Sequence, residues 1–120
     1  MTMRMRRSEL ATPGSSEKMI TKAAASDADL VFLDLEDAVA PAEKVPSRKN
    51  LVRGLNELDW GNTLRAVRVN GPHTEWAYGD VIEIVEGAGA NLDVMIIPKV
   101  KAPRDVWFYD TLLTQLEERV

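Results

Sequence analysis

Apolar residues gather in short runs along this chain, and amphipathic stretches separate the runs. Four strand-like segments can be read, at 8–12, 29–34, 64–69 and 93–98. The last three are rich in Val, Ile and Leu at successive positions, which is typical of parallel strands buried on both faces. The first segment is weaker and is predicted mainly from its place in the pattern.

A helix-like segment follows each predicted strand, at 15–26, 47–58, 76–89 and 103–120. The first has Ser15 or Ser16 as its capping residue. All four carry aliphatic side chains at helical spacing: Met19, Ile20, Ala23 and Ala24; Leu51, Val52, Leu55 and Leu58; Val81, Ile82 and Val85; Val106, Leu112, Leu113 and Leu116. The three tryptophans lie in or beside the helices and are predicted to pack: Trp60, Trp76 and Trp107.

This alternation of strands and helices predicts an α/β fold with a parallel sheet. A small doubly wound sheet and half of a (β/α)8 barrel both have it. No G-x-G-x-x-G motif follows a strand, which argues against the dinucleotide-binding form of the doubly wound sheet. We therefore predict the N-terminal half of a (β/α)8 barrel over 8–120, preceded by a basic tail at 1–7. We expect the barrel to continue beyond Val120.

Composition narrows the functional classes. The 120 residues carry a formal net charge of -4 and include no cysteine. An acidic chain has no general attraction for nucleic acid or anionic membranes. No apolar run approaches the roughly 18 residues of a membrane span, and the basic N-terminus lacks the apolar core of a secretory signal. We therefore expect a cytoplasmic protein that binds neither nucleic acid nor membrane.

Polar residues cluster where the predicted strands end, the edge at which ligands bind in both architectures. These ends read Thr12-Pro13-Gly14, Asp34-Leu35-Glu36-Asp37, Arg68-Val69-Asn70-Gly71 and Pro98-Lys99. Adjacent carboxylates repel each other unless a cation, a donor or a shared proton relieves them. We therefore predict that the acids lie outside the core, at the rim of a site, opposite Arg68 and Lys99.

Each candidate also has a structural interpretation. Gly14 serves either a tight turn or an anion site at a helix N-terminus. Glu36 and Asp37 are either site residues or helix-start acids in ion pairs. Arg68 binds a ligand or only pairs with these acids, and Lys99 either forms an ion pair or contacts a ligand.

Four segments, in this order and spacing, carry a family resemblance: "RSELATPGSSEKMITKAAASDADLVFLDLEDAVAP", "LDWGNT", "VRVNG" and "IIPKV". Together they resemble the citrate lyase β-subunit/HpcH–HpaI aldolase superfamily, and within it the malyl-CoA and β-methylmalyl-CoA lyases most closely. The resemblance implies a (β/α)8 barrel that forms or cleaves a carbon–carbon bond between an acyl-CoA and an oxo acid such as glyoxylate, using Mg²⁺. It also implies a homotrimer or homohexamer.

The resemblance assigns roles to four residues. Arg68 matches an arginine that holds the oxo acid and its developing oxyanion. Glu36 and Asp37 match acids that line the site beside the waters of the metal, and Lys22 matches a lysine that contacts coenzyme A. The direct metal ligands are expected beyond Val120, so we expect residues 1–120 alone to lack lyase activity. Two alternatives stay open: an aldolase acting on free hydroxy-oxo acids, and a catalytically incomplete half-barrel that serves as an interaction module.

Overall fold

The computed structural model describes residues 6–119, and in them strands and α-helices alternate as predicted. The strands are β1 (Glu9–Pro13), β2 (Leu30–Asp34), β3 (Leu64–Arg68) and β4 (Val94–Ile96). The α-helices are α1 (Glu17–Ala24), α2 (Lys44–Glu57), α3 (Ala77–Ala88) and α4 (Pro103–Arg119). Two 3₁₀ helices, η1 (Pro41–Glu43) and η2 (Gly89–Asn91), precede α2 and follow α3.

The start of the predicted tail and the end of the predicted half-barrel lie outside the described residues. Of the predicted tail at 1–7, residues 1–5 lie outside the described residues, and Val120 does so at the other end. Arg6 and Arg7 are exposed, and the backbone N–H of Arg7 donates to Asp29. No helix within residues 6–119 combines the length and the apolar character that crossing a bilayer requires.

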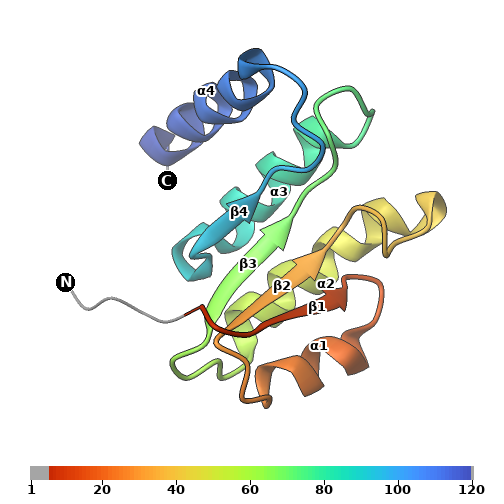
Figure 1. Cartoon of the computed structure of the whole chain (residues 1–120), viewed down its shortest axis with the longest axis vertical. Coiled ribbons are helices and arrows are strands. Elements are labelled where there is room, and N and C mark those ends of the chain that lie inside the picture. The colour runs from red at the N-terminus through yellow and green to blue at the C-terminus, as the bar shows by residue number, and fades with distance from the viewer. Residues whose placement is uncertain (1–5, 120) are drawn as a thin grey trace.

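The four strands form one parallel sheet in the order β1-β2-β3-β4 (Figure 1). Each strand lies beside its predecessor in the sequence, and a helix connects every neighbouring pair. This order separates the two predicted architectures, because a doubly wound sheet reverses its strand order at a switch point whereas a barrel does not. The units are arranged like the first four of a (β/α)8 barrel, which confirms the predicted fold class.

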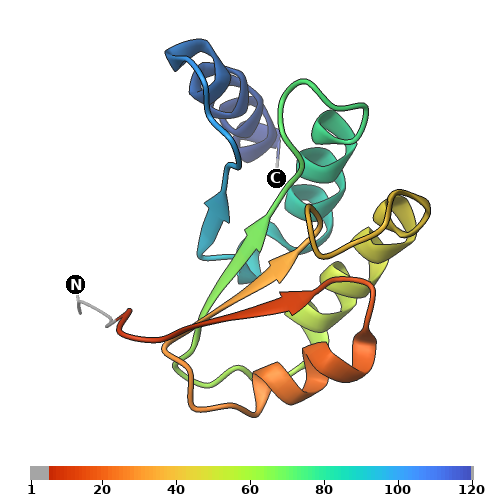
Figure 2. The same cartoon turned by 45° about the vertical axis from the view of Figure 1, so that its right-hand side comes forward.

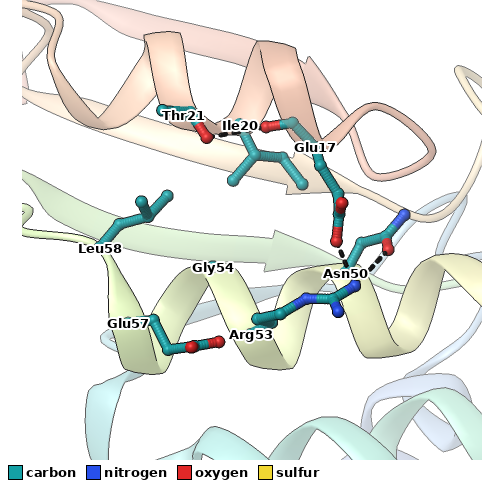
Figure 3. A pocket seen from close by; sticks show the side chains of 8 residues that line it. All are labelled: Glu17, Ile20, Thr21, Asn50, Arg53, Gly54, Glu57 and Leu58. Atoms are coloured by element: carbon teal, nitrogen blue, oxygen red, sulfur yellow. Dashed lines mark hydrogen bonds and ion pairs between the residues drawn. The ribbon is translucent and has the colours of Figure 1, made fainter.

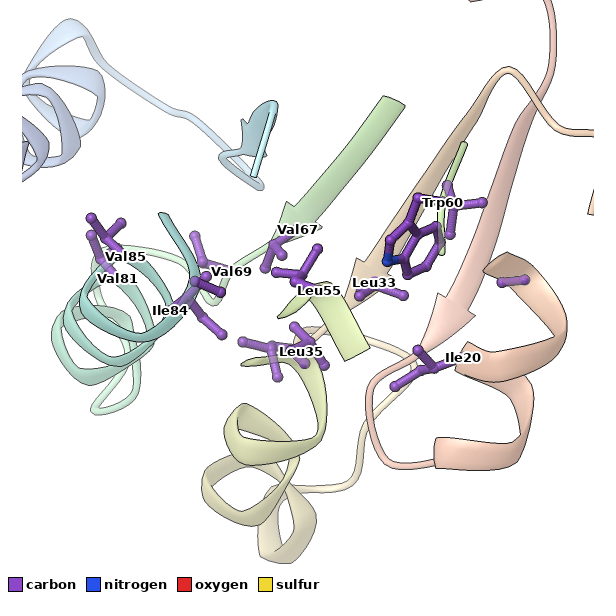
Figure 4. Packing of buried hydrophobic residues seen from close by; sticks show 14 of the residues in the cluster. Ile20, Leu33, Leu35, Leu55, Trp60, Val67, Val69, Val81, Ile84 and Val85 are labelled. Carbon is purple, nitrogen blue, oxygen red and sulfur yellow. The ribbon is translucent and has the colours of Figure 1, made fainter. Parts of the chain in front are cut away.

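The two faces of the sheet have different neighbours. The helices cover one face (Figure 2), and strand side chains on that face form the main core with them (Figure 4). The other face carries a smaller apolar cluster of strand residues only: Leu30, Leu64 and Ala66, with Phe32, Val94 and Ile96 packed against them. Side chains alternate between faces along a strand, so Asp34 and Arg68 continue this second cluster at the ends of β2 and β3.

Helix α1 begins at its predicted cap and packs closely against α2. The Ser16 hydroxyl accepts a hydrogen bond from the N–H of Met19 at 3.2 Å. A Cβ atom at Gly54 of α2 would lie only 2.8 Å from Cγ2 of Ile20, so glycine permits the close approach. Ile20 and Ala23 are buried, but Met19 is 48% exposed and was wrongly placed in the buried stripe.

Two other helices depart from the sequence pattern. Helix α2 begins at Lys44, three residues before the predicted start, because η1 leads directly into it. On α4, Val106 and Trp107 are exposed, so the prediction that they pack is wrong. Tyr109 is the fully buried side chain of that helix. Helix α4 packs mainly against α3, which leaves much of its surface without a neighbour among the described elements.

Candidate active site

Arg68 and Asp34 form the centre of a charged cluster at the ends of β2 and β3. The two residues are register partners in the parallel sheet and therefore point to the same face. Arg68 donates from Nε to Oδ1 of Asp34 at 2.9 Å and from Nη2 to Oδ2 at 2.7 Å. Such a bidentate pair fixes the plane of the guanidinium group. The ring of Phe32 lies beneath it, 5.3 Å from Cζ to the ring centroid.

Asp34 uses its whole carboxylate to organise this region. Besides holding Arg68, it accepts hydrogen bonds from the N–H groups of Glu36 at 2.8 Å and Ala38 at 3.0 Å. Burial by itself would raise the pKa of Asp34, but these hydrogen bonds outweigh it and hold the pKa below its ordinary value. The same hydrogen bond to Asp34 raises the pKa of Arg68. Asp34 is thus ionised and directs Arg68 rather than facing a ligand itself.

Arg68 keeps donors that no described residue contacts. Its side chain is 28% exposed, and within residues 6–119 no hydrogen-bond partner contacts Nη1. A guanidinium group has five N–H donors in a planar fork, which suits carboxylates. With one edge occupied by Asp34, the remaining edge can accept an anion at a fixed orientation.

Lys99 connects the other two acids of the cluster. Its Nζ lies 2.8 Å from Oε2 of Glu36 and 3.0 Å from Oδ1 of Asp37, and hydrogen bonds to these two acids raise its pKa. Oε1 of Glu36 lies 3.5 Å from Nε of Arg68. Lys99 has a φ of 50°, which is uncommon for a residue other than glycine. We call these five residues the mouth cluster: Asp34, Glu36, Asp37, Arg68 and Lys99.

The structure corrects the prediction that all these acids lie outside the core. Asp34 is 1% exposed and Glu36 is also buried, whereas the Asp37 side chain is 65% exposed. The cations of the mouth cluster compensate for this burial, because buried carboxylates need partners. The prediction that the strand ends lie close together agrees with the structure, but the sequence analysis did not predict that Asp34 orients Arg68.

A second set of polar residues lies behind the mouth cluster, between the strand ends and α2, α3 and α4. We call it the inner network, and it consists of Lys44, Arg48, Asn70, Asp80 and Tyr109. Asp80 accepts hydrogen bonds from Arg48 Nε at 2.8 Å, from the Asn70 side chain at 2.7 Å and from the Asn70 N–H at 2.9 Å. The Tyr109 hydroxyl donates to the Asn70 carbonyl at 2.6 Å. Burial, with the nearby Asp80 carboxylate, raises the pKa of Tyr109 and keeps this donor protonated.

Sequence reasoning missed most of the inner network, although a signal was present. Asp80 lies four residues before the buried Ile84, and Lys44 lies three residues before the buried Ser47 and seven before Leu51. Both charges therefore interrupt the apolar stripe of their helix at helical spacing. A charge on such a stripe is buried only when it has partners, and this rule could have identified both residues.

Two other candidates lie outside the mouth cluster. Lys22 is exposed in the last turn of α1, the end of the helix that leads toward the start of β2, so the structure does not group it with Arg68. At Gly14, a Cβ atom would lie 2.5 Å from Cδ1 of Leu51 and 2.8 Å from the Asp34 carbonyl. Close packing therefore explains this glycine.

A pocket of about 300 Å³ opens between α1 and α2, on the helical side of the sheet (Figure 3). An ion pair between Glu17 and Arg53 spans it, and Asn50 lies beside them. None of the residues predicted to form the site contributes to its lining. The mouth cluster and this pocket are therefore separate places in the fold.

The fold and the cluster define a barrel-type α/β protein with an arginine at its strand ends that a buried aspartate holds in place. The family model described as HpcH/HpaI aldolase/citrate lyase matches residues 7–120. The chain therefore belongs to the HpcH/HpaI aldolase/citrate lyase family.

Two curated relatives from Cereibacter sphaeroides carry related names. An L-malyl-CoA/beta-methylmalyl-CoA lyase is 46% identical over 114 residues, covering 95% of this chain and 36% of the relative. A (3S)-malyl-CoA thioesterase is 46% identical over 100 residues, covering 83% of this chain and 34% of the relative. The chain thus spans about a third of the length of these relatives.

Solved structures agree with the fold. A Haloferax volcanii malate synthase in a magnesium/glyoxylate complex superposes with a TM-score of 0.81 at 21% identity, over 92% of this chain and 37% of that one. CitE from Mycobacterium tuberculosis, in complex with magnesium, acetoacetate and coenzyme A, superposes with a TM-score of 0.67 at 29% identity, over 88% of this chain and 38% of that one.

A metal site is not complete in this part of the chain. Within residues 6–119, no group of three or more acidic, histidine or cysteine side chains is placed to enclose an ion. Asp34 is fully engaged, and Lys99 contacts both Glu36 and Asp37. These residues alone therefore do not fit direct coordination of a divalent cation, although carboxylates such as that of Asp37 can accept hydrogen bonds from the waters of a hydrated Mg²⁺ ion.

Proposed function

We propose that this chain forms part of a lyase that cleaves or forms a carbon–carbon bond between an acyl-CoA and a small oxo acid, as in malyl-CoA cleavage. One observation carries the proposal: Asp34 holds Arg68 in a fixed plane at the strand ends, with donors left for an anion. The names of the relatives supply the substrate class. Support is strongest for the acyl-CoA lyase, since its relatives match nearly the whole chain.

The proposed reaction breaks the bond between the carbinol carbon of malyl-CoA and the carbon next to the thioester. The hydroxyl group loses its proton and its carbon becomes the aldehyde of glyoxylate. The bond electrons pass to the carbon next to the thioester, where the thioester carbonyl stabilises them as an enolate, and this carbon takes up a proton to give acetyl-CoA. Condensation is the reverse, with an alkoxide forming from the aldehyde oxygen.

In this scheme Arg68 binds the oxo-acid carboxylate and stabilises the oxygen on which negative charge develops. A preorganised donor at such a position is commonly the largest contribution to catalysis. Asp34 orients that donor, and Glu36 and Asp37 face the reacting groups from the neighbouring strand end. The assignment of Lys22 to coenzyme A rests on the family resemblance and stays a prediction.

Magnesium belongs to the proposal and not to the described geometry. When bound, a divalent cation supplies Lewis-acid stabilisation of the developing alkoxide. Glu36 and Asp37 would contact its waters, while its direct ligands would come from residues other than 6–119. The cytoplasmic location and the trimeric or hexameric assembly also stay predictions.

The test uses a protein of the relatives' length that contains this chain, which we call the full-length protein. Incubation with L-malyl-CoA should release glyoxylate and acetyl-CoA in equal amounts, measured by phenylhydrazine trapping and by chromatography of the thioesters. Glyoxylate release should fail after removal of divalent cations and return with added Mg²⁺. Absence of carbon–carbon cleavage under all these conditions would refute the lyase.

Thioester hydrolysis is the second candidate, because the thioesterase relative is also 46% identical to this chain, although over 100 residues and not 114. Hydrolysis of malyl-CoA would instead yield malate and free coenzyme A, with the carbon skeleton intact. The same assay distinguishes hydrolysis from carbon–carbon cleavage, since a reagent that reacts with free thiol groups detects coenzyme A but not acetyl-CoA.

A further inference from the structure

Lys44 occupies an unfavourable position for a lysine. It is the first residue of α2 and only 7% exposed. The N-terminal end of a helix carries partial positive charge, which disfavours a cation there. Burial of an ammonium group adds a desolvation cost unless its donors are all satisfied. A residue that meets both costs needs compensating contacts.

These contacts come from neutral groups. Nζ of Lys44 donates to the carbonyl of Leu35 at 2.9 Å, to the carbonyl of Glu36 at 2.6 Å and to Oδ1 of Asn70 at 2.9 Å. Its three N–H donors are therefore matched by three acceptors. The ring of Trp76 lies 5.2 Å away and adds a cation–π contact. Among the described residues, no carboxylate forms an ion pair with Lys44.

Two of the three acceptors are successive carbonyls of the segment that carries the acids of the mouth cluster. Glu36 is consequently held on both sides. Its N–H donates to Asp34, and its carbonyl accepts from Lys44. The backbone direction at Glu36 sets where its carboxylate points, and that carboxylate contacts Lys99 and Arg68.

Charge balance also connects the two clusters. In the mouth cluster three carboxylates face two cations, which leaves one negative charge in excess. Behind it, Arg48 of the inner network pairs with Asp80 and lies 3.9 Å from Glu83, so Lys44 is the cation of this network that has no carboxylate partner among the described residues. The Asn70 amide joins Lys44 to Asp80. The ammonium group of Lys44 thus lies directly behind the acidic segment.

We propose that Lys44 is a positioning residue, which holds the 35–36 carbonyls so that the Glu36 carboxylate faces Arg68 and the bound oxo acid. The proposal rests on the lyase function proposed above. Lys44 does not touch the substrate; it acts through Glu36. If Lys44 served stability alone, the effect of its substitution on activity would not depend on the Glu36 side chain.

The test compares Lys44→Met with Lys49→Met in the full-length protein. Lys49 lies on the same helix but is exposed, which makes it a matched control. Lys44→Met should lower kcat by about 10- to 100-fold, as losses of supporting contacts around an active site commonly do, with the KM for the CoA ester nearly unchanged. Hydrogen exchange of the 34–39 segment should accelerate in Lys44→Met only.

A double-mutant cycle with Glu36→Gln distinguishes positioning from general stability. If Lys44 acts through Glu36, Lys44→Met should cost far less activity in the Glu36→Gln background than in wild type. If the two substitutions acted independently, the activity loss of the double variant would equal the product of the two single losses to within about twofold. Multiplying losses, or a Lys44→Met enzyme as active as Lys49→Met, would overturn the proposal.

Two further outcomes are decisive. If Lys44→Met does not fold, Lys44→Arg replaces it in the same cycle, because a planar fork keeps the charge but cannot place donors on the same three acceptors. If the wild-type protein shows no lyase activity, the proposed function fails, and exchange of the 34–39 segment alone decides the role of Lys44. Unchanged exchange in the Lys44 variant would refute that role whatever the activity.

Discussion

The inner network and the mouth cluster contain similar residues but use them differently. In the inner network the charged groups are satisfied by protein partners: Arg48 and Asn70 satisfy Asp80, which has no exposed surface. In the mouth cluster, Arg68 and Lys99 are partly exposed, and Arg68 keeps donors that no residue within 6–119 contacts. A closed set of charges fixes geometry, whereas an open set can bind a ligand. Substitutions in the two sets should therefore affect different measurements.

The largest expected effect is on stability, at the inner network. Arg48→Met removes the ion-pair partner of the buried Asp80 and should lower the free energy of unfolding by about 3–5 kcal/mol, because an unpaired charge is left inside. Urea denaturation of the full-length protein measures it. The control is Arg53→Met on the same helix, whose surface ion pair with Glu17 should contribute only about 0–1 kcal/mol. Equal losses in both variants would contradict the distinction between the clusters.

The next effect is on catalysis, at the mouth cluster. Arg68→Ala should lower kcat/KM for the oxo acid by about 10²- to 10³-fold, because it removes a donor aimed at a developing oxyanion. The KM for the CoA ester should change little. Arg68→Lys should recover only part of the loss, since a point charge cannot reproduce the bidentate contact. Steady-state kinetics on variants shown to be folded by circular dichroism decide this, and a rate within about threefold of wild type would refute the assignment.

A smaller effect should separate the buried acid Glu36 from the exposed acid Asp37. Glu36→Gln should lower kcat by about 10- to 100-fold, the range expected for a group that contacts the waters of a metal ion and not the ion itself. Asp37→Asn should cost less, because its side chain is largely exposed and Lys99 is its contact. Kinetics across a Mg²⁺ titration measure both. If Asp37→Asn proved the more damaging substitution, Asp37 rather than Glu36 would face the reacting groups.

The fold was predictable from sequence because hydrophobic periodicity is local. A few consecutive residues are enough to recognise the buried runs in β2 and β3, and the same is true of the Ser16 cap. Failures occurred where burial depends on a neighbour distant in sequence. Met19 and Trp107 have apolar side chains but lie on faces that no described element covers.

The site was predictable only in part, for a related reason. Arg68 and Glu36 follow from the rule that parallel strands end at one edge. Which carboxylate pairs with Arg68 depends on strand register, since Asp34 and not Glu36 lies opposite it. The roles of Lys44 and Asp80 require α2 and α3 to be placed against the strand ends, information that no single segment contains.

The smallest effect concerns pH and tests how Asp34 stabilises the mouth cluster. Its pKa is lowered in the folded protein, so its contribution is fully present above its unfolded pKa of about 3.9. That contribution is lost as the pH falls through the folded pKa, because the unfolded state binds more protons in that interval. Unfolding free energies of wild type should therefore decline more steeply on the acid side than those of Asp34→Asn, which should be less stable at neutral pH but flatter in profile. Asp27→Asn is the control, because it removes a carboxyl group that is exposed. Parallel wild-type and Asp34→Asn profiles would show that Asp34 does not couple folding to protonation, and Arg68 would then need another group to orient it.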